Sequence, residues 1–333
     1  MSWKVLITAR TLNEVGATAL KMLRSAGCEI IMPAKFGPHR PETLLPLLDG
    51  ADAVLASMDQ YNADVLASPA ARNLKIISRW GVGYDAIDVP AATRLGIVVA
   101  YTPGILDEAV ADFAFGLLLT LARRIHLGHM SMVQGQWQGF WGHDVHGKTL
   151  GILGCGRIGT AMARRGTGFG MRLLSYDISD NPEAQKLGVK RVPLDQLLAE
   201  SDFVSLHAAL TPENRGLLGE AQLRKMKPNA YLINAARGAL VDEAALVKAL
   251  TENWIAGAAL DAFVVEPLPA EHPLRKAPNI LLTPHLASFG RETGERVSNL
   301  AAQAIVDLAS GKKPDLILNP EVFKSPALRA KLR

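Results

Sequence analysis

The chain has 333 residues, of which 49% are hydrophobic and 20% are charged, and its formal net charge is +4. This length allows two domains of ordinary size, and this composition is typical of a soluble globular protein. It excludes a membrane span, because no apolar run is long enough, and it gives no sign of nucleic-acid binding, because aromatic and basic residues are not interleaved.

The two cysteines, Cys28 and Cys155, are too few for a disulfide framework and lack the spacing of a metal site. The amino-terminal residues have no signal-peptide layout, since they lead directly into an apolar strand pattern. Both observations predict a cytoplasmic protein with reduced cysteines and no metal.

The first hundred residues alternate short apolar runs with helical patterns. The runs predict strands at residues 4–8, 29–32, 53–56, 75–78 and 97–100. Helices are expected between them, for example over residues 13–25 and 62–71. Such alternation predicts an α/β domain built on a parallel sheet.

A break in this pattern at residues 102–104 precedes a long apolar helix, which is expected over residues 105–125. An irregular stretch that contains Trp137, Phe140 and Trp141 follows the helix. The break is therefore a candidate hinge and domain boundary.

The stretch that follows has the pattern of a dinucleotide site. An apolar run over residues 150–153 predicts a buried strand, and a second run over residues 171–176 ends at Asp177. A helical segment over residues 157–167 lies between the two runs. Three glycines at G-x-G-x-x-G spacing join the first strand to this helix, namely Gly154, Gly156 and Gly159.

Each part of this pattern has a physical task. The first glycine allows a tight turn, the second lets a pyrophosphate approach the backbone, and the third lets helix and strand pack closely. The phosphates bind free N–H groups at the helix N-terminus, while Asp177 accepts hydrogen bonds from the adenosine ribose. The acid favours NAD over NADP, because a carboxylate repels a 2′-phosphate. The predicted cofactor contacts here are Gly154, Gly156, Arg157, Ile158, Gly159 and Asp177.

Further strands are expected at residues 203–206, 230–234, 256–260 and 280–283, and a last helix at residues 291–309. Arg237, Glu266 and His285 each come shortly after one of the last three strands. Taken singly, these residues have ordinary structural interpretations as an ion-pair partner, a helix cap and a core histidine. Ligands of α/β sheets bind beyond the carboxyl ends of the strands, so the three together predict a catalytic site.

The motifs GILGCGRIG, LINAARGALVDEAAL, AALDAFVVEPLP and LTPHLAS resemble those of the D-isomer-specific 2-hydroxyacid dehydrogenase family. The resemblance extends from about residue 78 to residue 309. It implies that Arg237, Glu266 and His285 are catalytic, that the cofactor is NAD, and that the enzyme is a homodimer. The dimer contact would include much of residues 105–141.

The resemblance also assigns the remaining site residues. Residues 79–85 resemble the family's substrate loop, whose backbone N–H groups hold the carboxylate of a small 2-hydroxy or 2-oxo acid. The expected substrate contacts are Arg79, Val82, Gly83 and Arg237, and the further cofactor contacts are His207, Ala235, Ala236, Asp261 and His285.

The chemistry of these side chains agrees with the implied roles. Oxidation of a 2-hydroxy acid removes a proton from the hydroxyl group and a hydride from C2. His285 is suited to take the proton, and Glu266 is expected to bond the other ring nitrogen and favour the imidazolium. Arg237 presents a planar fork to the substrate carboxylate, and Asp261 is placed to orient the nicotinamide carboxamide.

The loop around Arg79 resembles phosphoglycerate dehydrogenases in particular, in a short form without the regulatory extension. This likeness favours a phosphorylated or otherwise anionic substrate. Tyr101, however, stands where many phosphoglycerate-type members carry Asn. Glycerate, hydroxypyruvate, glyoxylate and lactate-type substrates therefore all remain open.

The fingerprint lies mid-chain, which makes the first α/β segment a separate domain. The expected fold is α/β, with two Rossmann-like or flavodoxin-like parallel-sheet domains and a hinged cleft. Residues 1–101 and 288–333 would form the substrate domain, and residues 102–287 the NAD-binding Rossmann domain.

Two other functions on the same scaffold are weighed against this one. An NAD-sensing corepressor can keep the same three residues, but it uses long flexible extensions that this sequence does not show. A formate- or phosphite-type dehydrogenase takes a different electron donor, and Val82 has no charge with which to hold an inorganic oxyanion.

Overall fold

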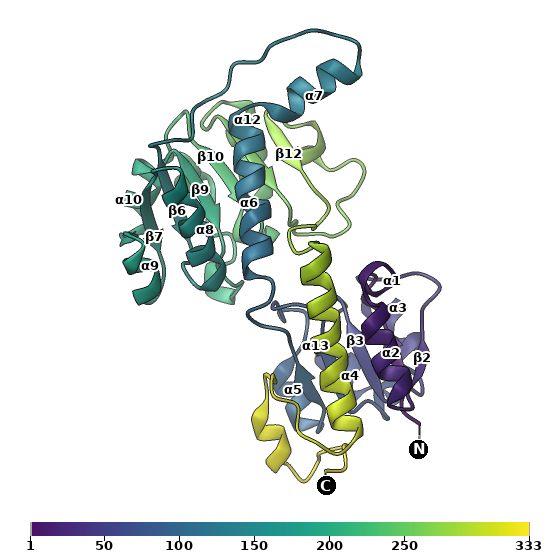
Figure 1. Cartoon of the computed structure of the whole chain (residues 1–333). Coiled ribbons are helices and arrows are strands. Elements are labelled where there is room, and N and C mark those ends of the chain that lie inside the picture. The colour runs from purple at the N-terminus through teal and green to yellow at the C-terminus, as the bar shows by residue number, and fades with distance from the viewer. Residues whose placement is uncertain (1, 333) are drawn as a thin grey trace. The chain divides into compact units, whose positions relative to one another are not determined.

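The computed structural model describes residues 2–332 and divides into two compact units. Unit 1 comprises Met1–Leu106 with Phe289–Arg333, and unit 2 comprises Asp107–Ser288. Each unit has its own parallel sheet with helices on both faces (Figure 1). The predicted α/β class with two parallel-sheet domains is therefore confirmed.

Unit 1 contains a five-stranded sheet in the order β2-β1-β3-β4-β5. The strands are β1 (Lys4–Ile7), β2 (Glu29–Ile31), β3 (Ala53–Ala56), β4 (Ile76–Arg79) and β5 (Val98–Ala100). They coincide with the apolar runs of the sequence, because a strand covered on both faces must be apolar almost throughout.

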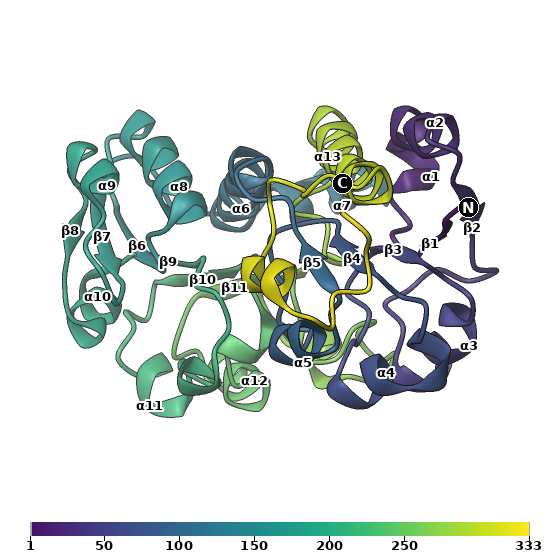
Figure 2. The ribbon, with the colours of Figure 1, turned by 90° about the horizontal axis from the view of Figure 1, so that it is seen from below.

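The two faces of this sheet are covered by two sets of helices (Figure 2). One set is α1 (Leu12–Val15), α2 (Ala17–Ser25) and α13 (Arg291–Ala309). The other set is α3 (Pro41–Leu48), α4 (Ala63–Ala67) and α5 (Val89–Arg94), with the short 3-10 helices η1 (Pro69–Ala71) and η5 (Pro320–Lys324) nearby. The last helix, α13, packs on α2 and β4, and the Ser78 hydroxyl donates to the carbonyl of Ala301 at 2.8 Å.

Helices expected to be continuous are interrupted at three places. The helix predicted over residues 13–25 breaks at Gly16 into α1 and α2. The one predicted over residues 62–71 breaks before Pro69, because the residue that precedes a proline avoids the helical conformation. The one predicted over residues 105–125 stops at Ala122, and Arg124 adopts a left-handed conformation with φ of 55°.

Unit 2 contains a seven-stranded parallel sheet in the order β12-β11-β10-β9-β6-β7-β8. The strands are β6 (Thr149–Leu153), β7 (Arg172–Tyr176), β8 (Lys190–Arg191), β9 (Phe203–Leu206), β10 (Tyr231–Asn234), β11 (Gly257–Leu260) and β12 (Ile280–Leu282). The chain order reverses between β6 and β9, which creates the kind of switch point where dinucleotides bind. Among the strands within residues 2–332, the sequence did not predict β8, an exposed edge strand of two basic residues with no apolar run.

Helices also cover both faces of the unit 2 sheet (Figure 2). On one face lie α6 (Asp107–Ala122), α8 (Arg157–Gly168) and α9 (Pro182–Lys186); on the other lie α10 (Leu194–Glu200), α11 (Glu220–Leu223) and α12 (Glu243–Thr251). Separate apolar cores fill the two interfaces. No helix within residues 2–332 has the combined length and apolar character that a bilayer span requires.

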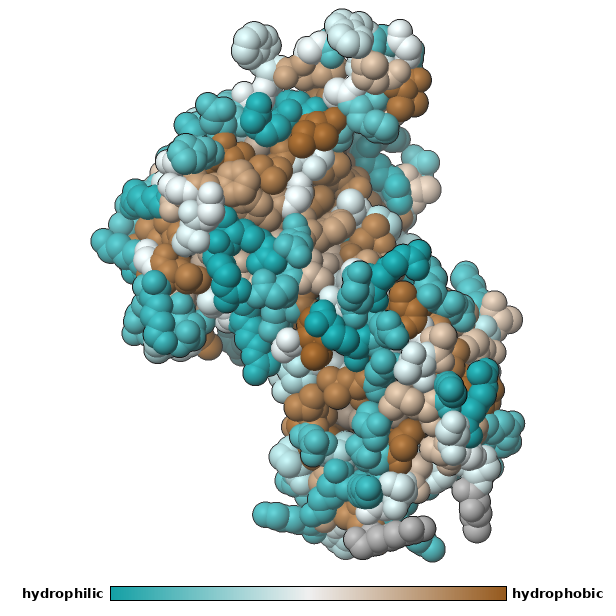
Figure 3. Space-filling model, in the orientation of Figure 1, coloured by the Kyte–Doolittle hydropathy of each residue, from teal (hydrophilic) through white to brown (hydrophobic). Residues whose placement is uncertain are grey.

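An arm, formed by α7 (Ile125–Val133) and the irregular segment that returns to β6, stands away from the rest of unit 2 (Figure 1). Most of its apolar side chains are exposed, with Trp137 at 91% and Trp141 at 99%. Hydrophobic and hydrophilic residues are mixed on the face of the molecule that Figure 3 shows. The arm is attached where His143 Nδ1 lies 2.8 Å from the Tyr231 hydroxyl. An exposed apolar surface of this kind is typical of a region that contacts another molecule.

Candidate active site

Three neighbouring strands of unit 2 bring the predicted reactive residues to one edge of the sheet. Arg237 follows β10, Glu266 follows β11 and His285 follows β12. These strands pair in parallel, so their carboxyl ends meet at the same edge. His285 Nδ1 lies 2.8 Å from Oε2 and 3.0 Å from Oε1 of Glu266. The contact predicted between these two side chains is thus present.

The environment of Glu266 keeps its carboxylate ionised. Burial opposes ionisation, but the hydrogen bond and charge of His285, the amide of Phe263 at 2.9 Å and the charge of Arg237 more than offset it. The pKa of Glu266 is therefore lowered from its ordinary range. A carboxylate in this position stabilises a positive charge on the imidazole ring that it contacts.

The protein bonds only one of the two ring nitrogens of His285. Its Nδ1 faces Glu266, whereas its Nε2 makes no hydrogen bond with any residue from 2 to 332. If Nδ1 carries the proton toward the carboxylate, Nε2 is left with a lone pair directed outward. The backbone of His285 is left-handed, with φ of 54°, a conformation that a non-glycine residue adopts at a cost.

Asp261 fixes the loop on which His285 stands. It is 1% exposed and accepts from the Thr283 hydroxyl at 2.6 Å and from the amides of Leu286 and Ala287 at 2.8 Å each. Burial raises the pKa of Asp261 despite these donors. The sequence predicted a contact of Asp261 with the nicotinamide carboxamide, but it did not predict that Asp261 braces the loop of His285.

The loop that carries Arg237 is fixed by its neighbours. Asn234, which is fully buried, donates to the carbonyl of Arg237 at 2.9 Å and accepts from the amide of Ala236 at 3.0 Å. A Cβ at Gly238 would lie 2.0 Å from the carbonyl carbon of Phe263. Only glycine therefore lets this loop touch the loop of Glu266. Sequence reasoning did not select Asn234, although its N-x-x-R-G spacing is the signal that could have found it.

The glycine-rich turn between β6 and α8 leaves room for a dinucleotide. A Cβ at Gly154, whose φ is 88°, would lie 2.3 Å from the nitrogen of Ala208, and a Cβ at Gly159 would lie 2.2 Å from the Gly154 carbonyl oxygen. Gly156 instead faces open space, with no atom within 4 Å of an added Cβ. The turn thus packs tightly on the protein side and is open on the other, as a pyrophosphate cradle requires.

Asp177 lies at the end of β7, beside this turn. Its Oδ2 accepts from the amide of Cys155 at 2.6 Å, and its Oδ1 accepts from the amide of Ser179 at 3.2 Å. A carboxylate has about four acceptor positions, so both oxygens retain capacity for ribose hydroxyls. The backbone segments of Arg157 and Ile158 begin α8 directly after the cradle.

Three more predicted cofactor residues lie on neighbouring strand ends. His207 follows β9, and Ala235 and Ala236 follow β10. The Nε2 of His207 lies 2.8 Å from the Ser205 hydroxyl, and burial lowers the pKa of His207 to about 4. Its buried Nδ1 has no partner among residues 2–332. Such an unpaired nitrogen fits a site that is completed by a bound ligand.

The predicted substrate loop follows β4 in unit 1. Val82 and Gly83 stand on it as expected, after Gly81, whose amide donates to the Thr102 hydroxyl at 2.9 Å. Arg79 is 8% exposed, and its Nε donates to the carbonyl of Gly83 at 2.9 Å. This arginine braces the loop from inside, so it gives no support to the phosphorylated substrate that its presence favoured.

Residues 115–287 match the NAD binding domain of the D-isomer specific 2-hydroxyacid dehydrogenase family. A glyoxylate reductase of Thermofilum pendens is 44% identical over 330 residues, which are 96% of this chain and 96% of that protein. One of Korarchaeum cryptofilum is 46% identical over 295 residues, which are 86% of this chain and 88% of that protein.

Solved structures show the same likeness over nearly the whole chain. A glyoxylate reductase of Paecilomyes thermophila is 31% identical with a TM-score of 0.82, and the match covers 96% of this chain and 99% of that one. The D-lactate dehydrogenase of Escherichia coli is 32% identical with a TM-score of 0.82, and the match covers 95% of this chain and 99% of that one.

Proposed function

The chain belongs to the D-isomer specific 2-hydroxyacid dehydrogenase family and is an NAD-dependent oxidoreductase, and on this premise we propose that it reduces glyoxylate to glycolate. Relatives at 44% and 46% identity that carry the name glyoxylate reductase support this substrate, whereas no observation supports a phosphoglycerate-like one. The observation that carries the chemistry is the Glu266–His285 pair, with one ring nitrogen held and the other open.

His285 is the acid–base in this proposal. In the reduction of glyoxylate, the protonated ring donates its Nε2 proton to the carbonyl oxygen, which becomes the hydroxyl group of glycolate. The bound cofactor supplies the hydride that C2 receives. Glu266 keeps the ring oriented and stabilises its charged form before the proton leaves.

Arg237 is the proposed anchor and electrostatic partner of the oxo acid. Its guanidinium offers parallel N–H donors to a carboxylate, and its positive charge favours the negative charge that develops on the C2 oxygen. The amides of Val82 and Gly83 are the proposed further contacts of the substrate carboxylate. These contacts orient C2, and orientation is a large part of the rate gain in such reactions.

The cofactor would be held by the residues that the glycine-rich turn brings together. Gly154, Gly156 and Gly159 shape the cradle, the first N–H groups of α8 face the pyrophosphate, and Asp177 accepts from the ribose. His207, Ala235, Ala236 and Asp261 are the proposed contacts toward the nicotinamide end. The repulsion between Asp177 and a 2′-phosphate supports a preference for NADH over NADPH.

A panel of 2-oxo acids assayed with NADH and with NADPH tests the proposal. We expect oxidation of NADH with glyoxylate, slower turnover with hydroxypyruvate and pyruvate, and weak activity with NADPH. Turnover of a phosphorylated oxo acid in preference to glyoxylate would contradict the substrate assignment. No turnover with any member would contradict the function itself.

We also propose that the protein is a homodimer in the cytoplasm. The exposed apolar arm supports the dimer, because a second copy would cover Trp137 and Trp141. The two cysteines are buried and unpaired, which suits a reducing compartment. Light scattering after size exclusion should give twice the mass of the chain, and a variant with Trp137→Ser and Trp141→Ser should give the mass of one chain. A monomeric parent would contradict the dimer.

A further inference from the structure

The loop that carries Glu266, residues 262–266, is held by apolar packing at its start but not in its middle. Ala262 and Phe263 are 2% and 8% exposed, whereas Val264 and Val265 are 50% and 41% exposed. The amide of Phe263 donates to Glu266 itself at 2.9 Å, within the loop. The amide of Val264 donates to Oε1 of Glu243 at 2.9 Å, and within residues 2–332 this is the only hydrogen bond that joins Val264 to another element.

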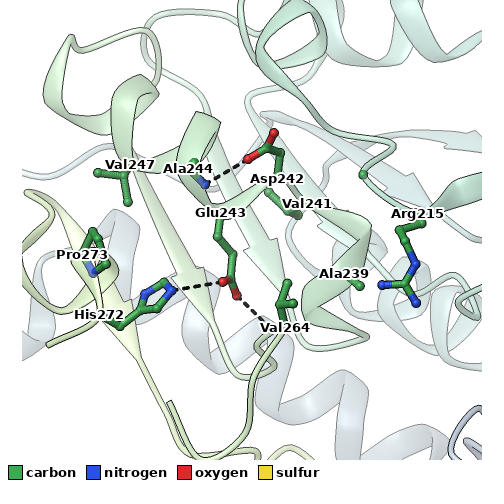
Figure 4. A pocket seen from close by; sticks show the side chains of 11 residues that line it. Arg215, Ala239, Val241, Asp242, Glu243, Ala244, Val247, Val264, His272 and Pro273 are labelled. Carbon is green, nitrogen blue, oxygen red and sulfur yellow. Dashed lines mark hydrogen bonds and ion pairs between the residues drawn. The ribbon is translucent and has the colours of Figure 1, made fainter. Parts of the chain in front are cut away.

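Glu243 is well placed to act as a fixed acceptor. It is the first residue of α12, and the preceding Asp242 caps that helix by accepting from the amides of Ala244 and Ala245 at 3.0 Å each. The backbone of Glu243 is therefore set by the start of a nine-residue helix. Because the cap is made by Asp242, the Glu243 side chain is free to turn toward the loop (Figure 4).

His272 supports Glu243 from the opposite side. Its Nε2 lies 3.4 Å from Oε2 of Glu243, and its Nδ1 accepts from the amide of Leu274 at 3.4 Å. An Nδ1 that accepts leaves the ring proton on Nε2, directed at the carboxylate. Leu274 is fully buried, so the imidazole is tied to a rigid part of unit 2. Figure 4 shows Glu243 between His272 and Val264, with dashed lines to both.

We propose that Glu243, supported by His272, is a positioning residue for the reaction. Its carboxylate holds Val264 on one side of the loop, while the close contact with Gly238 fixes the other side. The loop so held presents Glu266 to Nδ1 of His285. This inference rests on the proposed acid–base role of that pair, and it assigns to Glu243 an effect on the reaction without any contact with substrate.

The surroundings of Glu243 allow the proposal to be tested without disrupting the fold. Glu243 borders a pocket of about 600 Å3, which is also lined by Arg215, Val247 and Pro273 (Figure 4). A shorter or uncharged side chain at this position would face that pocket rather than leave a sealed cavity in the core. The helix cap is provided by Asp242 and would be unchanged.

Two conservative variants separate the effect of the length of the Glu243 side chain from the effect of its charge. Glu243→Gln keeps the length of the side chain and an oxygen that can accept from Val264, but it loses the charge. Glu243→Asp keeps the charge but is one methylene too short to reach the amide. A positioning role predicts that Glu243→Gln retains most of the parent kcat for glyoxylate, whereas Glu243→Asp loses roughly tenfold in kcat with its KM for NADH unchanged.

The pH dependence of glyoxylate reduction distinguishes a positioning role of Glu243 from a merely structural one, because loss of a structural contact would not change it. In Glu243→Asp, Glu266 holds His285 less well, so reduction should fade at a lower pH than in the parent. The charged groups that face this pair are Arg237 and Asp261, and neither is changed by the substitution. The matched control is Glu252→Ala, which removes a carboxylate at the other end of α12, where it accepts from Trp254 Nε1 at 3.0 Å. We expect this control to leave kcat and the pH profile unchanged.

The proposal is overturned if Glu243→Asp keeps the parent kcat and pH profile, or if Glu243→Gln loses as much as Glu243→Asp. Its failure can be told apart from failure of the proposed function. An NMR titration of the His285 ring in the protein without substrate should show a lower midpoint in Glu243→Asp than in the parent, even if no oxo acid is turned over. Equal midpoints in that titration would also refute the positioning role.

Discussion

Two glutamate–histidine pairs lie in unit 2, and they differ in whether the protein bonds the second ring nitrogen of the histidine. Glu266 holds Nδ1 of His285 at 2.8 Å, and Nε2 of that ring has no bond to any residue from 2 to 332. Glu243 lies 3.4 Å from Nε2 of His272, whose Nδ1 also accepts from the backbone. A histidine exchanges a proton with a substrate only through a nitrogen that the protein has not bonded. The first pair is thus suited to chemistry and the second to support.

The backbone at the two histidines differs in the same sense. His285 has φ of 54°, in the left-handed region, whereas His272 has an ordinary φ of −61°. A strained residue persists only where its surroundings hold it, and Asp261 holds the loop of His285 through three donors. Strain and an open nitrogen therefore occur together at one histidine and are both absent at the other.

Removal of the His285 imidazole should give the largest loss of activity among the variants considered. We expect His285→Ala to lower kcat for glyoxylate by about 10²–10⁴-fold, because general acid–base catalysis contributes on that scale. The affinity for NADH, measured by fluorescence titration, should stay near that of the parent. His272→Ala is the matched variant and should lose far less. Equal losses in the two variants would show that the pairs do not differ as described.

Arg237 acts on the Glu266–His285 pair, since its charge helps to lower the pKa of Glu266. Arg237→Lys keeps a positive charge but loses the planar fork. We expect kcat/KM for glyoxylate to fall by about 10²-fold, with the affinity for NADH nearly unchanged. A comparable loss of NADH affinity would instead assign Arg237 to the dinucleotide.

Asp177 belongs to neither pair. A substitution there should therefore change cofactor binding without changing the proton transfer. Asp177→Ala removes an acceptor for the ribose and a charge that repels a 2′-phosphate. We expect NAD affinity to fall by roughly 1.5–3 kcal/mol and discrimination against NADP to relax. At saturating NADH, the pH dependence of reduction should be that of the parent. Unchanged affinity for both nucleotides would exclude Asp177 from the ribose.

His207 adds a third case to the comparison, a half-buried histidine with no carboxylate partner among residues 2–332. An ordinary histidine titrates near 6.5, but burial lowers the pKa of His207 to about 4. Between these values the unfolded chain binds a proton that the folded chain rejects, so folding stability falls as the pH falls from about 6.5 to about 4. His207→Asn should reduce this loss of folding stability at acid pH, by no more than ~3 kcal/mol.

Urea unfolding at pH 7 and pH 4.5 measures this effect. The difference between the two free energies of unfolding should be smaller in His207→Asn than in the parent. The same difference in both proteins would mean that His207 is not the group responsible.

Buried strands were the part of the fold that the sequence predicted best. The runs at residues 53–56 and 203–206 match β3 and β9 at both ends, since a parallel strand covered on both faces must be apolar throughout. Helix interruptions were missed where the cause is local. The left-handed Arg124 belongs to a residue type that ordinarily continues a helix, so nothing in the pattern announced it.

The contacts of the candidate site that join two side chains could be predicted from the sequence. The contacts between a side chain and a backbone amide could not. Glu266 and His285 each follow a predicted strand, and their charges suit one another, so their contact could be expected. The partner of Glu243 is the amide of Val264, which leaves no trace in the sequence. The bracing role of Asp261 was missed for the same reason, because two of its three donors are backbone amides.

The most direct test of the central claim is the pH–rate profile of glyoxylate reduction in the parent and in Glu266→Gln. Deuterated NADH should first establish that hydride transfer limits the rate in both proteins. Glu266 has a lowered pKa and is ionised at neutral pH, so its charge favours the imidazolium form that reduction requires. The substitution should therefore shift the fading of reduction to lower pH. Superimposable profiles would contradict the Glu266–His285 pairing as the acid–base device of this enzyme.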